Sequence, residues 1–106
     1  MTPKDATTAF LKAMRDIFGA YEFTLEEIKS RSWSSATFTG ARHELTFVIA
    51  GEGALGAADD FLANLEAREF TLRGHIMADI ALVSEERRDG EHSVRITLEA
   101  LTVEDS

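Results

Sequence analysis

The sequence contains no cysteine, and only one of its 106 residues is proline. A chain without thiols forms no disulfide and offers no thiolate to a metal, so it suits a reducing compartment. No apolar run approaches the length that a membrane-spanning helix needs, and the N-terminus lacks the basic and apolar segments of a secretion signal. We therefore expect a cytoplasmic protein with no membrane partner.

Basic residues are scarce as well. The chain has 11 Lys and Arg against 19 Asp and Glu, which gives a formal net charge of −8. The basic residues are scattered, so attraction to a phosphate backbone is not expected and nucleic acid is excluded as a partner. Hydrophobic residues make up 44% of the chain and include seven Phe, which is enough for one core. The composition predicts a single acidic domain that spans residues 1–106.

Two stretches repeat apolar residues at the spacing of an amphipathic helix. The first covers residues 6–17. The second starts at Ala54 and ends near Arg68, with Asp59 and Asp60 expected early in the helix, where the helix dipole favours negative charge. Each helix would bury one apolar stripe.

The segment between the helices predicts a β-hairpin. Residues 33–39 form a polar run that a strand tolerates, and residues 42–50 alternate in polarity. A two-residue turn at Gly40 and Ala41 would bring polar residues together on one face and apolar residues on the other.

The segment before this hairpin has two interpretations. In residues 21–31, apolar residues alternate like those of a strand, whereas Thr24 and Glu27 match a helix capping box. We favour a strand that bends near residues 28–30. It would give the sheet a fifth strand.

A second hairpin follows the second helix, and its turn decides which side chains meet. Residues 76–82 and 94–100 alternate between apolar and less apolar residues, as half-buried strands do. A two-residue loop would mix the two faces of the pair. A three-residue loop at residues 88–90, with its glycine in the left-handed conformation, keeps the faces separate and sets Asp79 directly opposite Glu99.

This order of elements predicts an α+β fold. The order is α-β-β-α-β-β, in which a mainly antiparallel four- or five-stranded sheet carries two helices on one face. The fold is a two-layer sandwich. Its second sheet face, which we call the helix-free face, has no helix to cover it.

The predicted register places two carboxylates, Asp79 and Glu99, side by side on the helix-free face. Like charges in this position repel unless a cation, a proton or a metal lies between them, and such a pair can act as acid and base. Arg42 and Arg95 would supply cations, and His75 is expected on the same strand face as Asp79. His75 would lie roughly 13 Å along the strand from Asp79, so no metal site is predicted. The alternative is a surface ion cluster.

The helix-free face is also expected to carry an apolar patch. Its members are Trp33, Val48, Met77, Val83, Leu101 and Val103. Six apolar residues on one sheet surface, bordered by polar ones, predict a contact surface or a shallow pocket.

A protein-binding function explains this patch most simply. We favour a binding protein that forms a homodimer through its helix-free face. Met77, Leu101 and Val103 would lie at the centre of the interface.

The alternative function is a small-molecule-binding protein or an enzyme. Asp79 and Glu99 would be its catalytic acid and base. The ligand would be contacted by Trp33, Arg42, Arg95 and His75. No residue pattern identifies a cofactor or a substrate, and the sequence leaves open whether the protein is an enzyme.

A glycine-rich loop offers a weaker third interpretation. Residues 51–56 match the dinucleotide-binding pattern G-x-G-x-x-G between a strand and a helix. That pattern belongs to a parallel βαβ unit, whereas this strand is expected in an antiparallel hairpin. Glu52, Asp59 and Asp60 would also repel a pyrophosphate. The glycines are therefore expected to turn the chain from strand into helix.

One histidine is expected on the apolar side of the first hairpin. There, His43 would lie opposite Phe38. A histidine in this position is typical of a hydrogen-bonded structural residue.

Overall fold

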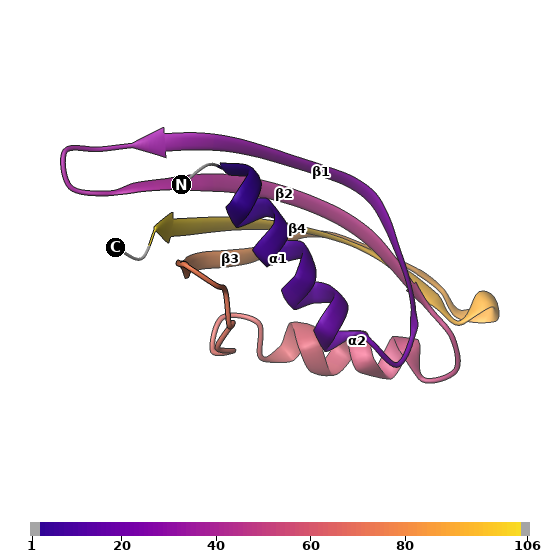
Figure 1. The fold of residues 1–106 in the computed structure, drawn as a ribbon. Helices are drawn as coiled ribbons and strands as arrows, with labels where there is room; N and C mark the ends of the chain where they lie inside the picture. The colour runs from indigo at the N-terminus through magenta and orange to yellow at the C-terminus, as the bar shows by residue number, and fades with distance from the viewer. Residues whose placement is uncertain (1–2, 105–106) are drawn as a thin grey trace.

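The computed structural model describes residues 3–104, and the side chains of residues 6–104. The elements are α1 (Pro3–Ile17), β1 (Glu22–Ser34), β2 (Thr39–Ala50), α2 (Ala54–Ala63), β3 (His75–Arg88), the short 3-10 helix η1 (Asp89–Glu91) and β4 (Ser93–Glu104). The strands form one antiparallel sheet with the order β1-β2-β4-β3. Figure 1 shows both helices on one face of this sheet, which confirms the predicted two-layer α+β fold and its element order.

The core lies between the helices and the two central strands. β2 and β4 bury every second residue along most of their length, because successive side chains of a strand point to opposite faces. The largest buried side chains are Phe10, Met14, Phe18, Leu45, Phe47, Ile49, Phe61, Ile96 and Leu98. Burial of each such side chain contributes about 1.5–3 kcal/mol, so the apolar faces of β2 and β4 determine which side of the sheet the helices cover.

The first hairpin turns earlier than predicted. The chain reverses through residues 35–38, where the Ser35 hydroxyl accepts hydrogen bonds from the backbone amides of Thr37 (3.3 Å) and Phe38 (3.0 Å). This serine-capped turn does not need a glycine. The predicted turn at Gly40 is wrong, because Gly40 lies inside β2.

The structure also decides between the two interpretations of residues 21–31. β1 is one continuous strand from Glu22 to Ser34, so the strand interpretation is confirmed and the helix-cap interpretation is wrong. The irregularity lies between Leu25 and Glu27, not near residues 28–30. The segment that was predicted as a fifth strand is therefore part of β1. Within the described residues, the sheet has four strands.

The second hairpin has a longer turn than predicted. Arg88 pairs with Ser93, and the residues between them form η1 and His92. His92, with φ 49°, adopts the left-handed conformation that was predicted for Gly90. The three-residue loop is therefore wrong.

β3 contains two bulges that change its register against β4. They lie between Met77 and Asp79 and between Leu82 and Ser84. Each bulge adds one residue to β3 without a partner on β4. Side chains alternate between the two faces of a strand. One extra residue therefore moves every side chain on one side of the bulge to the opposite face of the sheet.

The glycine-rich loop turns β2 into α2, as expected. Gly51 and Gly53 have φ angles of 128° and 88°, in the region that favours glycine. A Cβ added to Gly53 would lie 3.5 Å from the Tyr21 hydroxyl, so the Tyr21 ring lies against this loop. β2 is antiparallel to both neighbours, so the loop lacks the parallel βαβ setting of a dinucleotide site.

α2 is shorter than predicted. It ends at Ala63, before the predicted end near Arg68. Asp59 and Asp60 consequently lie in the middle of α2, away from its N-terminus, so the helix dipole does not explain them. Asp59 instead forms an ion pair with Arg87 of β3, which ties α2 to the sheet and lowers the pKa of Asp59.

Candidate functional site

The candidate site is the helix-free face, where the strand register arranges side chains in rows across the sheet. From β1 to β3, three successive rows are Trp33, Gly40, Val103 and Ile76; then Arg31, Arg42, Leu101 and Asp79; then Lys29, Glu44, Glu99 and Ala81. We call these three rows the open end. The first row is apolar, and the next two carry charges of both signs.

A hollow of about 380 Å³ lies over the two charged rows. Its charged lining residues are Lys29, Arg31, Arg42, Glu44, Asp79 and Glu99. The three cations come from β1 and β2, whereas Asp79 and Glu99 come from β3 and β4. The hollow is therefore more basic on the β1 side and more acidic on the β3 side.

The predicted pairing of Asp79 with Glu99 is wrong. Asp79 lies opposite Leu101, and Glu99 lies opposite Ala81, because the longer turn shifts β3 along β4 and the bulge between Leu82 and Ser84 offsets only part of that shift. Both carboxylates nevertheless line the same hollow. The structure thus brings the two predicted catalytic residues to one site, one row apart.

A different carboxylate lies directly opposite Glu99. Glu44 of β2 pairs with Glu99 of β4, and Arg42 of β2 pairs with Arg31 of β1. Sequence reasoning missed Glu44 because α2 and β3 separate β2 from β4 in the chain, so no local turn fixes the register between these two strands. Two like-charge cross-strand pairs therefore lie side by side in the hollow.

Most charges of the hollow lack an ion-pair partner. Within residues 3–104, no ion pair involves Arg31, Arg42, Glu44, Asp79 or Glu99. The exception is Lys29, whose Nζ lies 3.2 Å from Oε1 of Glu27. The open end is thus available for charges from another molecule.

The apolar row has one very close backbone contact. A Cβ added to Gly40 would lie 2.0 Å from the Thr102 carbonyl oxygen and 3.0 Å from Cζ2 of Trp33. Glycine is therefore needed at position 40 for the approach of β2 to β4 and to the Trp33 ring. Trp33 Nε1 is buried and has no hydrogen-bond partner among the described residues.

Trp33 and Val48 do not lie together as predicted. Trp33 lies opposite Gly40 at the open end, whereas Val48 pairs with Thr24 and Arg95 further along the sheet. The longer β1 moves the tryptophan to the end of the strand pair. Trp33 lies in the row next to the hollow but does not line it, and Val48 lies further away.

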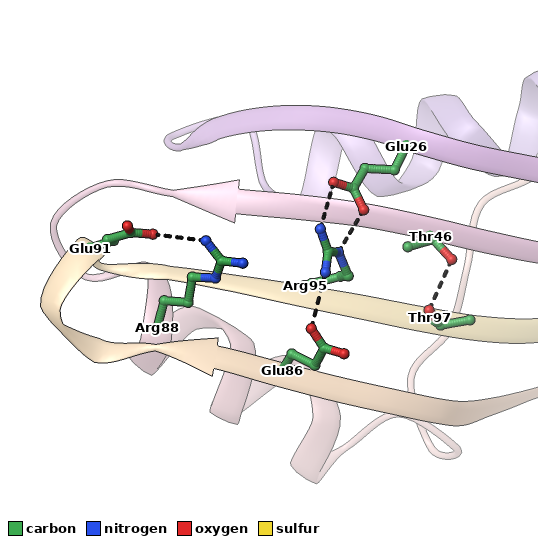
Figure 2. A network of polar contacts seen from close by, with 7 residues as sticks. All are labelled: Glu26, Thr46, Glu86, Arg88, Glu91, Arg95 and Thr97. Atoms are coloured by element: carbon green, nitrogen blue, oxygen red, sulfur yellow. Dashed lines mark hydrogen bonds and ion pairs between the residues drawn. The ribbon is translucent and has the colours of Figure 1, made fainter.

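Arg95 does not line the hollow as the predicted ligand-binding role requires. Its Nε and Nη2 donate to Glu26 at 2.6 and 3.1 Å, and its Nη1 donates to Glu86 at 3.0 Å. Figure 2 shows Arg95 between these two carboxylates, which come from β1 and β3. We call this group the Arg95 cluster. It joins both edges of the sheet to β4, so its role is structural.

The Arg95 cluster also changes the acidity of its members. The hydrogen bond and the charge of Arg95 lower the pKa of Glu26, and Glu26 and Glu86 raise the pKa of Arg95. Between this cluster and the hollow, the hydroxyls of Thr46 and Thr97 lie 2.9 Å apart in a hydrogen bond across β2 and β4 (Figure 2).

The bulge before Asp79 removes two predicted residues from the helix-free face. His75 is buried, and its Nδ1 donates to the Arg73 carbonyl oxygen at 3.0 Å. Met77 pairs with the buried Thr102 and packs against the core. His75 is therefore not a ligand residue of the hollow, and Met77 does not lie at the centre of the predicted interface.

His43 is a hydrogen-bonded structural histidine, as expected. Its Nδ1 lies 2.7 Å from the Ser30 hydroxyl and its Nε2 lies 2.9 Å from the Thr102 hydroxyl. Its partner on β1 is Ser30, and the predicted pairing with Phe38 is wrong. Burial lowers the pKa of His43, and the nearby His75 lowers it further.

The Ser30 and His43 contact resembles part of a nucleophilic site. No carboxylate orients the second ring nitrogen, however, because that nitrogen contacts Thr102. Ser30 also contacts the Thr7 hydroxyl of α1 at 2.5 Å. The chain of hydroxyls and imidazole therefore anchors α1 to the sheet.

Neither a metal site nor a membrane-spanning helix is found in the part of the chain that the structure describes. No three His, Asp or Glu residues of this part lie where they could hold a metal ion together. Neither helix is long and apolar enough to cross a bilayer.

A comparison with solved structures finds a similarity at the level of the fold. No family model matches the sequence, and no curated protein matches it. The chain is similar to a chain in the solved structure of the "virion of native gene transfer agent (GTA) particle", with a TM-score of 0.52 and 18% sequence identity. The match covers 80% of this chain and 69% of the other. At this level of identity the similarity concerns the fold alone.

Proposed function

We propose that the protein is an interaction protein that associates with other copies of itself through the open end of its helix-free face. One observation carries the proposal: apolar side chains lie there beside arginines and carboxylates that have no ion-pair partner within the described residues. Ile76 is 53% exposed, and Trp33, Leu101 and Val103 are partly exposed. Apolar residues bordered by unpaired charges are typical of a protein interface.

The edges of the sheet are less suited to association. β1 has one bulge and β3 has two, and bulges interrupt the hydrogen-bond ladder that an added strand would continue. β3 also ends in the charged residues 85–88. These features favour a contact through the face of the sheet over a contact through its edges.

The structural match gives limited support to a role in an assembly. The similar chain belongs to a virion particle, but the shared feature is the fold, and one fold can serve many functions. Self-association rests on the helix-free face itself.

The test is a charge placed in the open end. Leu101 lies between Arg42 and Asp79 on this face, so Leu101→Asp should convert associated protein into monomers in sedimentation velocity. Ser84→Asp adds the same charge to the same face outside the open end and should leave association unchanged. A wild-type chain that is monomeric at all concentrations, or a Leu101→Asp variant that associates like the wild type, would contradict the proposal.

A second candidate function is the binding of a small molecule in the hollow. Its volume of about 380 Å³ is in the range of known ligand sites, and its basic and acidic sides suit a molecule that carries both an amino and a carboxylate group. In an enzyme, Asp79 and Glu99 would be the acid and base.

A thermal-shift screen tests this second candidate. Free amino acids, other metabolites and divalent metals would be added to the wild type, since a ligand of the folded state raises the melting temperature. Hits should lose their effect in Asp79→Asn. Shifts that persist in this variant would argue against the hollow as the binding site.

A further inference from the structure

Two pairs of like charges occupy adjacent rows of the hollow. Arg31 of β1 pairs with Arg42 of β2, and in the next row Glu44 of β2 pairs with Glu99 of β4. Side chains that lie directly opposite each other on neighbouring strands have Cβ atoms about 4.5–5.5 Å apart, so each pair brings two like charges together. None of these four side chains has an ion-pair partner within residues 3–104.

The other two charged side chains of the hollow extend this division. Lys29 lies on β1 in the row next to Arg31, and Asp79 lies on β3 beyond Leu101. The cations therefore gather toward β1, and the anions gather toward β4 and β3. Three cationic and three anionic side chains line the hollow, so their formal charges sum to zero.

Each pair favours a group of opposite charge between its two members. Like charges that lie directly opposite each other destabilise a sheet, and a counter-charge relieves this repulsion. Guanidinium groups bind a carboxylate through paired charged hydrogen bonds, so a carboxylate suits Arg31 and Arg42. An ammonium group donates to carboxylates, so it suits Glu44 and Glu99. A ligand that carries both groups satisfies both pairs, whereas a purely anionic or purely cationic ligand satisfies only one.

The distance between the two pairs limits the length of such a ligand. Arg42 and Glu44 are two residues apart on β2, so the pairs are separated by roughly 7 Å along the strand. In a free α-amino acid, the amino nitrogen and the carboxyl carbon lie only about 2.5 Å apart, so this ligand reaches one pair. Two extended residues span roughly 7 Å, so the charged ends of a dipeptide match the spacing.

We propose that the hollow binds a zwitterion of dipeptide length, with its carboxylate between Arg31 and Arg42 and its ammonium group between Glu44 and Glu99. The proposal rests on the second candidate function, the binding of a small molecule in the hollow, and specifies the class of ligand. The volume of about 380 Å³ is near the lower end of the range of known ligand sites, which suits a molecule of this size.

An NMR titration with Gly-Gly tests the spacing and the two charges. The protein concentration is chosen so that sedimentation shows monomers, and self-association then does not compete with the ligand. Free glycine, N-acetyl-Gly-Gly and Gly-Gly amide are the matched probes, because the first has its charges too close together and the other two each lack one charge. Each should bind at least about tenfold more weakly than Gly-Gly, since each loses charged hydrogen bonds to one pair.

Double variants assign each charge of the ligand to one pair. When Arg31→Gln and Arg42→Gln are combined, Gly-Gly and its amide should bind equally, because the carboxylate has lost its partners. When Glu44→Gln and Glu99→Gln are combined, Gly-Gly and N-acetyl-Gly-Gly should bind equally. Both double variants should fold, because each removes a like-charge repulsion. Arg88→Gln, outside the hollow, is the control and should retain both differences.

The outcomes separate the ligand class from the second candidate function. If glycine binds as tightly as Gly-Gly and loses its binding in Asp79→Asn, the hollow binds a small molecule but the dipeptide spacing is wrong. Equal binding of Gly-Gly and its two singly charged derivatives to the wild type would overturn the assignment of the two pairs. If Gly-Gly does not bind, the ligand class is wrong, and the metabolite screen decides the second candidate function by itself.

Discussion

The Arg95 cluster and the open end lie on the same sheet face and contain the same kinds of residue, but they differ in how their charges meet. Arg95 lies between Glu26 and Glu86 and is hydrogen-bonded to both. At the open end, arginine faces arginine and glutamate faces glutamate. Residue content alone therefore does not distinguish a structural ion cluster from a surface available to a partner. The strand register makes that distinction.

The largest effect is expected from Gly40→Ala, which disrupts the packing of the open end. The added Cβ would lie 2.0 Å from the Thr102 carbonyl oxygen, and a backbone atom cannot move aside cheaply. We expect a loss of about 1–3 kcal/mol in the free energy of unfolding, measured by urea denaturation. Gly90→Ala is the control, because nothing lies within 4 Å of its added Cβ. Equal losses in both variants would contradict the close contact at Gly40.

His43→Gln should have the next largest effect, on the helix side beneath the open end. The variant disturbs the hydrogen bonds to Ser30 and Thr102, and we expect a loss on the order of 1 kcal/mol at pH 7. The measurement is thermal unfolding as a function of pH.

The pH dependence of this variant has a definite sign. Burial lowers the pKa of His43 in the folded state below its ordinary value of 6.5, so the unfolded chain binds the proton first. The wild type should therefore be fully stabilised by neutral His43 above pH 6.5 and lose this contribution as the pH falls through the folded pKa. His43→Gln should lack this loss, whereas His92→Asn, at an exposed histidine, should retain it.

A smaller effect is expected from Arg95→Gln. Its comparison with Arg42→Gln tests the difference between the Arg95 cluster and the open end. Arg95→Gln should lower the melting temperature because it removes the ion pairs with Glu26 and Glu86. Arg42→Gln should not, because Arg42 has no ion-pair partner in the described chain and faces Arg31. Both would be measured at concentrations where the chain is monomeric.

Acidic pH should reduce the difference in melting temperature between the wild type and Arg95→Gln. Arg95 lowers the pKa of Glu26 below its ordinary value of 4.5, so this pair stabilises the fold above that pH and loses its effect as the pH falls through the folded pKa. A difference in melting temperature that stays constant down to strongly acidic pH would assign the effect of Arg95 to packing instead of charge.

The smallest expected effect is a gain in stability in Glu99→Gln. Glu99 lies opposite Glu44, and removing one of two facing like charges should stabilise the monomer by about 0.2–1 kcal/mol at pH 7. Glu44→Gln should gain less, because Glu44 also faces Lys29. A loss of stability in Glu99→Gln would indicate that a cation lies between the two carboxylates.

The sequence alone determined the layers of this protein and much of its core. Alternation in residues 42–50 and 94–100 predicted the two central strands, and the helical spacing in residues 6–17 predicted the first helix. The same patterns placed the helices on one face, because apolar side chains of strands and helices must be buried together. His43 could also be assigned a structural role from its place on the apolar side.

Only the tertiary structure decided the register, and with it the candidate site. The bulge between Met77 and Asp79 has no marker in the local sequence, yet it turns His75 and Met77 toward the helix side. Gly40 was interpreted as a turn residue, although its lack of a side chain serves the contact with Thr102 on a strand 62 residues away in the sequence.

The physical reason is the difference between local and cross-strand interactions. Periodic burial acts along one element and is written in neighbouring residues, so it can be recognised from the sequence. The register depends on contacts between strands that are distant in the chain, and a shift of one residue exchanges the two faces of a strand. The rows of the helix-free face therefore follow from the packing of the whole sheet.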